Sequence, residues 1–302
     1  MRERIDTLIQ KLNKSIIVKS DAIRLVLVAL FSGGQALLED VPGVGKTLMA
    51  KSLARCLDGR FQRIQCTPDL LPTDVTGTNI WNPSKGEFQF LPGPVFANIL
   101  LTDEINRATP RTQSALLEVM EEHQVTIDGV TRPVPEPFFV IATQNPVEYQ
   151  GTFPLPEAQM DRFALSFSLG YPSEKEELRM IQQLDQSSYH PPLESCLTLD
   201  EVMAIRAQCA QVKFEGSLER YLLDLVRATR AHQDITLGVS PRGTVAFYRA
   251  IQALAYIEGR DYAIPDDVKL LAPYVLAHRL IPLGNQSPRQ LIGQLLAETP
   301  IP

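Results

Sequence analysis

The segment Glu39-Asp-Val-Pro-Gly-Val-Gly-Lys-Thr47 follows the short apolar run Ala36–Leu38 and precedes a helical pattern over Thr47–Leu57. Its glycines allow the backbone to curl so that successive N–H groups point at phosphate oxygens. The helix that follows adds the positive end of its dipole. This order of strand, glycine-rich loop and helix predicts a phosphate-binding loop, or P-loop. Its residues are Pro42, Gly43, Val44, Gly45, Lys46, Thr47 and Leu48.

Two side chains of the P-loop carry the expected chemistry. Lys46 can reach the β- and γ-phosphates of a nucleotide, and the Thr47 hydroxyl can ligate Mg²⁺. The usual pattern G-x-x-x-x-G-K-[ST] begins with glycine, where this chain has Asp40. Because a carboxylate facing the phosphates would repel them, we expect the Asp40 side chain to point away. The alternative is a glycine-rich turn that binds no ligand.

A second apolar strand pattern, Asn98–Thr102, is followed by two acidic residues, Asp103 and Glu104. Alone, such a pair is typical of a strand end that meets solvent. In an α/β domain that also contains a P-loop, it predicts the metal and catalytic carboxylates. Asp103 would hold Mg²⁺ through its water shell, and Glu104 would polarise the attacking water.

Three further polar side chains are candidates for the same site. Asn145 ends the strand pattern Phe138–Thr143 and could orient the attacking water, although asparagine before proline is also typical of a turn. Arg162 follows a turn-rich segment, and Arg242 begins a helix. Arginine at a helix N-terminus is disfavoured by the dipole, so Arg242 suggests an anionic partner. A solvated surface charge is the alternative for both arginines.

Composition limits the class of protein. The chain has 302 residues, with 44% hydrophobic and 21% charged residues and a net charge of −6. Such values are typical of a soluble globular protein and argue against one that mainly coats nucleic acid or anionic lipid. The longest apolar run, Ala22–Phe31, is too short to span a bilayer, and the N-terminus lacks a signal-peptide core. We expect a cytoplasmic protein without a membrane span.

The four cysteines, which lack metal-ligand spacing, are interpreted as reduced thiols: Cys56, Cys66, Cys196 and Cys209.

Strand and helix patterns alternate over residues 1–170, after an N-terminal amphipathic helix, and predict an α/β domain with a mainly parallel sheet. The predicted strands are Ala36–Leu38, Phe61–Gln65, Asn98–Thr102, Phe138–Thr143 and Phe163–Ser168, and Arg111–Glu122 is a further predicted helix. Over residues 171–302 strand patterns disappear, which predicts a smaller all-helical domain entered through a polar linker near 187–196. Its predicted helices include Leu218–Ala231, Thr244–Ile257 and Asp266–His278.

Two segments of the first domain are predicted hairpins. In Val125–Arg132 the dipeptide Asp128-Gly129 separates two β-branched runs, which is a strong hairpin signal. Thr78–Leu91 contains Trp81 and alternating phenylalanines around a polar turn. From pattern alone, surface decoration and a functional role are equally good interpretations of both.

Taken together, these motifs resemble the MoxR family of AAA+ ATPases over nearly the whole chain. The resemblance rests on the P-loop segment, Leu91–Asn98, Asp103–Ala108, Leu116–Glu122, Ala142–Pro146, Leu155–Phe163 and Val239–Arg242. It implies a P-loop AAA+ core with a parallel sheet flanked by helices, followed by an all-helical lid domain. It also implies a ring, usually hexameric, with ATP at the subunit interfaces.

The resemblance also implies residue roles. Lys46 and Thr47 match Walker A, and Asp103 and Glu104 match Walker B. Asn145 matches sensor 1, Arg162 the arginine finger and Arg242 sensor 2, which could serve its own or a neighbouring subunit. The hairpins at 78–91 and 125–132 match the helix-2 insert and the pre-sensor-1 hairpin, which face the central pore in related rings.

The expected function is therefore an ATP-hydrolysing ring that remodels a protein client or assists metal-cofactor insertion. A separate protein with a von Willebrand factor A domain is the expected partner. Two alternatives stay open: a P-loop kinase of a small molecule, and a chelatase-type assembly ATPase with low intrinsic hydrolysis. A nucleic-acid motor is disfavoured by the acidic charge balance.

Overall fold

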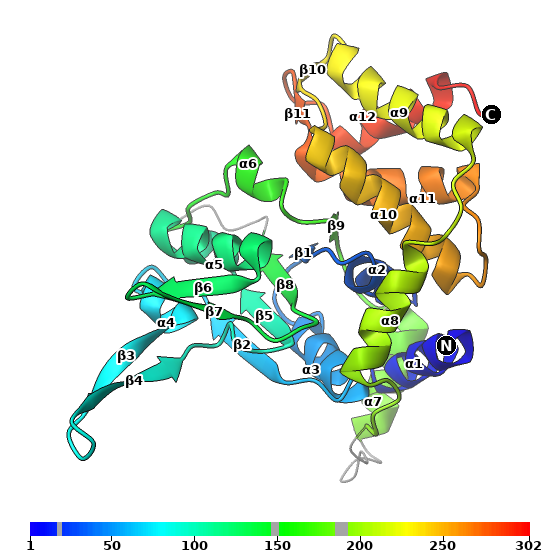
Figure 1. Ribbon diagram of the computed structural model, residues 1–302. Helices are drawn as coiled ribbons and strands as arrows, with labels where there is room; N and C mark the ends of the chain where they lie inside the picture. The colour runs from blue at the N-terminus through cyan, green and yellow to red at the C-terminus, as the bar shows by residue number, and fades with distance from the viewer. Residues whose placement is uncertain (17–19, 146–150, 185–192) are drawn as a thin grey trace.

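The computed structural model describes residues 1–16, 20–145, 151–184 and 193–302 (Figure 1). A parallel sheet lies at the centre of the N-terminal half, and a bundle of helices from the C-terminal half packs beside it. The fold is α/β with an attached helical region, as the sequence predicts.

The five strands of the sheet pair in parallel, in the order β2-β5-β8-β1-β9. All five predicted strands form: Phe61–Gln65 has the predicted ends, and the ends of the other four differ by at most two residues. They are β1 (Ala36–Glu39), β2 (Phe61–Gln65), β5 (Ile99–Asp103), β8 (Phe139–Gln144) and β9 (Leu165–Phe167). Because parallel strands end at the same edge, the segments that follow β1, β5 and β8 meet there.

Both faces of the sheet are buried, which explains why its strands are continuous apolar runs. Neighbouring residues of β5 point to opposite faces: Leu101 belongs to an apolar cluster with the helices of one side, and Leu100 to a cluster with the other. The first side carries α1 (Arg2–Ser15), α2 (Ser20–Phe31) and α3 (Lys46–Cys56), and the second carries α5 (Pro110–Glu122).

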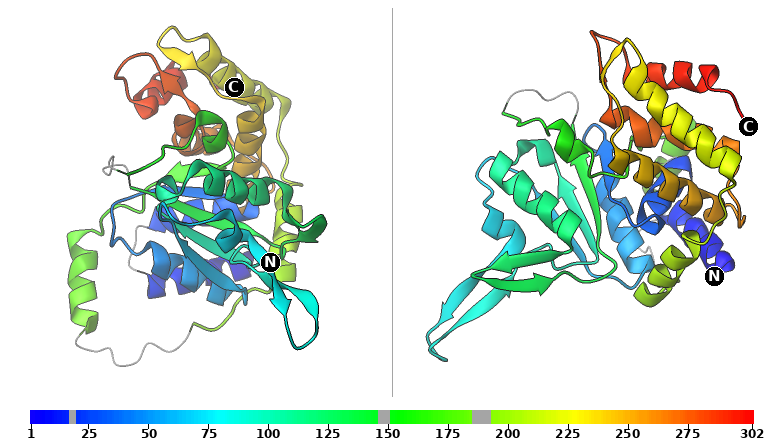
Figure 2. Two further views of the ribbon diagram at one scale, coloured as in Figure 1. Left: turned by 90° about the vertical axis from the view of Figure 1, so that its left-hand side faces the viewer. Right: turned by 45° about the horizontal axis from the view of Figure 1, so that its top comes forward.

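Short elements connect the strands of this region. They are α4 (Pro72–Thr76), the 3₁₀ helix η1 (Ile105–Arg107) and α6 (Glu157–Met160), whereas the longer helix α7 (Glu174–Leu184) follows the last strand of the sheet. Both predicted hairpins form, as β3 (Gly77–Asn82) with β4 (Glu87–Pro92) and β6 (Gln124–Ile127) with β7 (Val130–Pro133). In the second, Asp128 and Gly129 both have positive φ, as its two-residue turn requires. The β3–β4 hairpin projects from the molecule on the side opposite the helical region (Figures 1 and 2).

The helical region contains α8 (Leu199–Cys209), α9 (Gly216–Ala231), α10 (Pro241–Ile257), α11 (Pro265–Leu276), η2 (Ala277–Arg279) and α12 (Pro288–Glu298). It also holds a small antiparallel pair, β10 (Ile235–Leu237) and β11 (Ile281–Pro282), which the all-helical prediction missed. Strands of two or three residues are too short to show a two-residue period. Part of the predicted linker, 187–192, lies outside the described residues.

The helical region packs on the N-terminal helices. One apolar cluster joins α1, α2 and one face of the sheet to α8–α12. Residues 25–31 of α2 are all buried, because the sheet and the helical region cover opposite sides of this helix. The division of the chain at residue 170 stays a prediction. Among the described residues, we find no helix with the length and apolar character needed to cross a bilayer.

Candidate nucleotide-binding site

The P-loop connects β1 to α3 and is shaped by its glycines. Gly43 and Gly45 have φ of 91° and 92°, a conformation that side chains with a Cβ rarely adopt. Helix α3 begins at Lys46, and no side chain caps its first turn. Its first backbone N–H groups are therefore available to an anion, where the helix dipole also favours negative charge.

Lys46 and Asp40 are oriented by the loop backbone. The Lys46 ammonium donates to the carbonyl oxygens of Asp40 at 3.1 Å and Val41 at 3.3 Å. The buried Asp40 carboxylate accepts hydrogen bonds from the Ser168 hydroxyl at 2.5 Å and the Leu169 amide at 2.7 Å. It therefore points toward the end of β9, away from the loop cavity, as predicted. In this position it ties the end of β1 to the end of β9.

A cavity of about 200 Å³ lies at this edge of the sheet. It unites the P-loop with Asp103 and Glu104, as the sequence predicts. Sequence reasoning missed three other residues of its wall: Arg63 and Gln65 on β2, and Thr143 on β8. The lining residues are Pro42, Gly43, Gly45, Lys46, Thr47, Leu48, Arg63, Gln65, Asp103, Glu104 and Thr143.

Asp103 ends β5 and is held from two sides. Its Oδ2 accepts from Arg63 Nε at 2.6 Å, and its Oδ1 accepts from the Thr143 hydroxyl at 3.2 Å. Burial, together with the charges of Asp103 and Glu104, raises the pKa of the neighbouring Cys66 thiol to about 12. The carboxylates of Asp103 and Glu104 and the hydroxyls of Thr47 and Thr143 give this edge of the sheet the oxygen donors that a divalent cation requires.

Glu104 has an unusual backbone for a non-glycine residue, with φ of 56°. Its amide donates to the Thr143 hydroxyl at 2.9 Å, which holds this turn. Its carboxylate accepts from Gln65 at 3.1 Å and from Arg107 at 3.0 Å. Sparsely populated backbone conformations cluster at functional sites, because the surrounding structure must enforce them. The turn directs the Glu104 carboxylate into the cavity.

Asn145 directly follows β8 at the same edge of the sheet and is buried. It does not contribute to the wall of the cavity. The neighbouring Gln144 side chain donates to the Glu39 carboxylate at 2.7 Å, which joins the ends of β8 and β1. Residues 146–150 lie outside the described part of the chain.

Arg162 and Arg242 lie together but apart from the P-loop cavity. Both form ion pairs with Glu121 near the end of α5: Arg162 Nη2 lies 3.1 Å from Oε2, and Arg242 contacts Oε1. A separate cavity of about 300 Å³ has both arginines in its wall, with Arg249 and Arg279. In the described residues, the predicted site is therefore divided between a phosphate-binding edge and an arginine cluster.

The histidines and cysteines of the described residues form no cluster that could hold a metal ion. His278 is buried, and burial, assisted by the charge of Arg279, lowers its pKa well below the usual value. Of the four cysteines, Cys56 and Cys196 hydrogen-bond to each other through their side chains.

Comparison with known proteins agrees with this arrangement. Residues 35–165 match the family described as "ATPase family associated with various cellular activities (AAA)", and residues 227–296 match the AAA lid domain. The chain is 42% identical over 304 residues to the chaperone MoxR1 of Mycobacterium tuberculosis, covering 96% of this chain and 80% of that protein. It is 29% identical over 313 residues to the protein MoxR of Methylorubrum extorquens, covering 95% and 91%.

A solved structure shares the whole fold. The crystal structure of a Cytophaga hutchinsonii protein assigned as an ATPase superposes with a TM-score of 0.93 at 39% identity. The match covers 100% of this chain and 96% of that one. The P-loop and the two acids at the sheet edge, the helical lid and these relatives lead to one conclusion: the chain belongs to the MoxR family of AAA+ ATPases.

Proposed function

We propose that this ATPase works as a hexameric ring of identical subunits, in which each subunit binds ATP and its neighbour supplies two arginines. One observation carries the proposal. Lys46 and Glu104 line the P-loop cavity, whereas Arg162 and Arg242 converge on Glu121 elsewhere in the same chain. Because these two arginines lie together but outside the phosphate site of their own subunit, they are suited to act on the nucleotide of the next subunit.

ATP binding would use the P-loop backbone and one charged side chain. The N–H groups of the first turn of α3 would donate to the phosphates, and Lys46 would exchange the carbonyl oxygens of Asp40 and Val41 for the β- and γ-phosphates. Thr47 and Asp103 fit a Mg²⁺ site, because a hydroxyl and a carboxylate in one cavity wall are suitable oxygen donors. When bound, Mg²⁺ would neutralise charge on the β- and γ-phosphates.

Hydrolysis would depend on four side chains of this chain. Glu104 would accept the proton of the attacking water, a contribution of about 10²–10⁴-fold, and Asn145 would orient that water. Arg162 of one subunit would approach the γ-phosphate held by the next. Arginine fingers of this kind contribute about 10³–10⁵-fold. Arg242, in the first turn of α10, would donate hydrogen bonds to the same γ-phosphate from the lid.

The two hairpins are the proposed contact with a protein client. Trp81 and Phe88 face each other across the β3–β4 pair, with 54% and 70% of their surfaces exposed. Exposed aromatic side chains on a projecting hairpin suit an unfolded or partly unfolded polypeptide. Asn79 donates to Asp128 at 2.6 Å, which links this hairpin to the β6–β7 hairpin. Both hairpins would therefore move as one client-binding unit.

The relative from Mycobacterium tuberculosis is called a chaperone, which supports client remodelling as the purpose of hydrolysis. The finer expectation from the family resemblance is maturation of a complex or metal-cofactor insertion, together with a separate von Willebrand factor A domain protein. A small-molecule kinase would need a lid that covers the acceptor beside the phosphates. Among the described residues of the helical region, none lines the P-loop cavity, which favours the ATPase over the kinase.

Mixing two inactive variants tests the shared site. Arg162→Ala keeps its own P-loop but lacks the arginine, and Lys46→Ala keeps the arginine but lacks the phosphate contact. In mixed rings, some interfaces combine an intact P-loop with an intact arginine, so part of the ATPase activity should return. Native mass spectrometry with ATP would establish both mixed assembly and subunit number. Mixed rings without recovered activity would contradict the proposal.

A further inference from the structure

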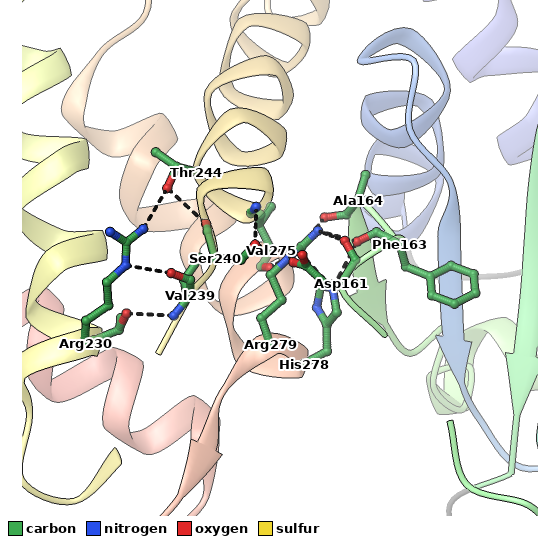
Figure 3. A network of polar contacts seen from close by, with 12 residues as sticks. Asp161, Phe163, Ala164, Arg230, Val239, Ser240, Thr244, Val275, His278 and Arg279 are labelled. Carbon is green, nitrogen blue, oxygen red and sulfur yellow. Dashed lines mark hydrogen bonds and ion pairs between the residues drawn. The ribbon is translucent and has the colours of Figure 1, made fainter. Parts of the chain in front are cut away.

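Arg279 is a buried cation at the junction of the lid and the sheet (Figure 3). Its side chain is 2% exposed, and all three guanidinium nitrogens donate hydrogen bonds. Nε lies 2.8 Å from Asp161 Oδ1, and Nη2 lies 2.6 Å from the Phe163 carbonyl oxygen. Nη1 donates to the carbonyl oxygens of Ala164, in the core, and Val275, in the lid. A buried guanidinium with so many acceptors ties the two regions together at one point.

Asp161 extends this connection to the first turn of α10. Its second oxygen, Oδ2, accepts a hydrogen bond from the Ser240 hydroxyl at 2.7 Å. Ser240 is the N-cap of α10, where its hydroxyl oxygen also accepts from the Gly243 amide at 3.0 Å. One carboxylate therefore joins the end of η2 to the start of α10.

Both arginines of the cluster are attached directly to this connection. Arg162 is the residue after Asp161, and Arg242 lies in the turn that Ser240 caps. Their side chains reach the same Glu121 carboxylate on α5. His278 contacts Arg279 and stays neutral because burial lowers its pKa, so it adds no second positive charge to the junction.

We propose that Arg279 and Asp161 are positioning residues that hold Arg162 and Arg242 as one unit for the adjacent subunit's nucleotide. This inference rests on the proposed function, because it assigns the two arginines to a neighbouring site. A displacement of about 1 Å in a group that acts on the transition state can cost about 10²-fold in rate. Neither positioning residue touches the P-loop cavity, so nucleotide binding in the same subunit does not depend on them.

Gly243 offers a way to disturb the junction without removing any hydrogen-bonding group. A Cβ on Gly243 would lie 2.8 Å from Arg279 Cδ and 2.7 Å from Val239 Cγ1. Gly243→Ala should therefore displace Arg279, although alanine is otherwise the better helix former. Gly293→Ala in α12 is the matched control, because nothing lies within 4 Å of a Cβ at that helical position. Asp161→Asn is a second variant, which keeps the side-chain shape and removes the charge.

Two quantities are measured for each variant: the turnover number for ATP hydrolysis and the affinity for a fluorescent ADP analogue. We expect Gly243→Ala and Asp161→Asn to lower kcat by about 10- to 100-fold, with the dissociation constant changed less than twofold. Unchanged affinity also shows that the variants are folded. Mixing either variant with Lys46→Ala subunits should restore part of the activity, whereas Gly293→Ala should match the wild type.

Wild-type kcat in both junction variants would overturn the inference. So would a parallel loss of nucleotide affinity and turnover, which would indicate a purely structural junction. Arg162→Ala mixed with Lys46→Ala separates the two proposals. If that mixture recovers activity and the junction variants do not, the positioning role is wrong. If that mixture recovers none, the shared site itself is wrong.

Discussion

Arg63 and Asp103 form an ion pair in the wall of the P-loop cavity, with Arg63 Nε 2.6 Å from Asp103 Oδ2. The pair joins neighbouring strands, β2 and β5, and leaves the Arg63 side chain 47% exposed. Its partner Asp103 is the carboxylate proposed to hold Mg²⁺, so a protein cation and a metal cation would share one acceptor.

Removing Arg63 tests this sharing. In Arg63→Ala, Mg²⁺ no longer competes with a guanidinium for Asp103, so we expect the Mg²⁺ concentration for half-maximal hydrolysis to fall. The change should be about two- to fivefold, because partly exposed ion pairs contribute about 1 kcal/mol or less. The measurement is ATPase rate against free Mg²⁺ at fixed ATP. Arg55→Ala, at an exposed position of α3, is the control. If Arg63→Ala instead needs a higher Mg²⁺ concentration for half-maximal hydrolysis, Arg63 contacts the phosphates rather than competing with Mg²⁺.

Lys46→Ala should weaken ATP binding by about 10- to 100-fold, because hydrogen bonds to charged groups contribute about 1.5–3 kcal/mol. Isothermal calorimetry with a non-hydrolysable ATP analogue measures the change. Lys51→Ala, at an exposed position of the same helix, should bind as the wild type does. If Lys46→Ala and the wild type bind the ATP analogue with equal affinity, Lys46 does not contact the phosphates.

Glu104→Gln should bind ATP normally and hydrolyse it about 10²–10⁴-fold more slowly. The amide oxygen can still accept from Gln65 and Arg107, so the turn should keep its shape, while the group that takes the proton is lost. Single-turnover hydrolysis and nucleotide affinity are measured on the same preparation. Glu122→Gln, exposed on α5, serves as the control. Wild-type turnover in Glu104→Gln would exclude Glu104 from the chemistry.

Trp81 is the single tryptophan of the sequence, so its fluorescence reports on the β3–β4 hairpin alone. With 54% of its surface exposed, it should emit as an indole in water. Adding an unfolded protein that lacks tryptophan, such as reduced and carboxymethylated ribonuclease A, should shift the emission to shorter wavelength if the hairpin binds polypeptide. Phe88→Ala should weaken the shift and preserve basal ATPase activity. If the emission spectrum does not shift at a saturating concentration of unfolded protein, the β3–β4 hairpin does not bind polypeptide.

Cys196 should be the most reactive thiol. The hydrogen bond with Cys56, followed by the charges of Lys11 and Arg4, lowers its pKa to about 7, although burial opposes the shift. Its thiolate fraction, and hence its alkylation rate with iodoacetamide, should rise through about pH 7, where half of the thiol is ionised, and level off above about pH 8. Cys66 and Cys209, whose pKa burial raises to about 12, are internal controls for mass-spectrometric mapping. Equal labelling of Cys196 and Cys209 at pH 8 would contradict this prediction.

Local patterns were sufficient for most elements and for half of the site. The five strands, the P-loop and both hairpins could be predicted because each is specified by neighbouring residues: a buried run, a glycine at positive φ, an Asp-Gly turn. Arg63 could not be found in this way. It lies within a strand, 40 positions from Asp103, and only the register of β2 against β5 brings the two side chains together.

The order of residues along the chain was enough to place Lys46 and Glu104 at one sheet edge, because parallel strands must end on the same side. The meeting of Arg162 and Arg242 on Glu121, and the burial of Arg279 against Asp161, depend on how α10 and η2 pack against the core. Those contacts join residues up to 121 positions apart. Their geometry follows from the packing of whole helices, which no short pattern in the sequence encodes.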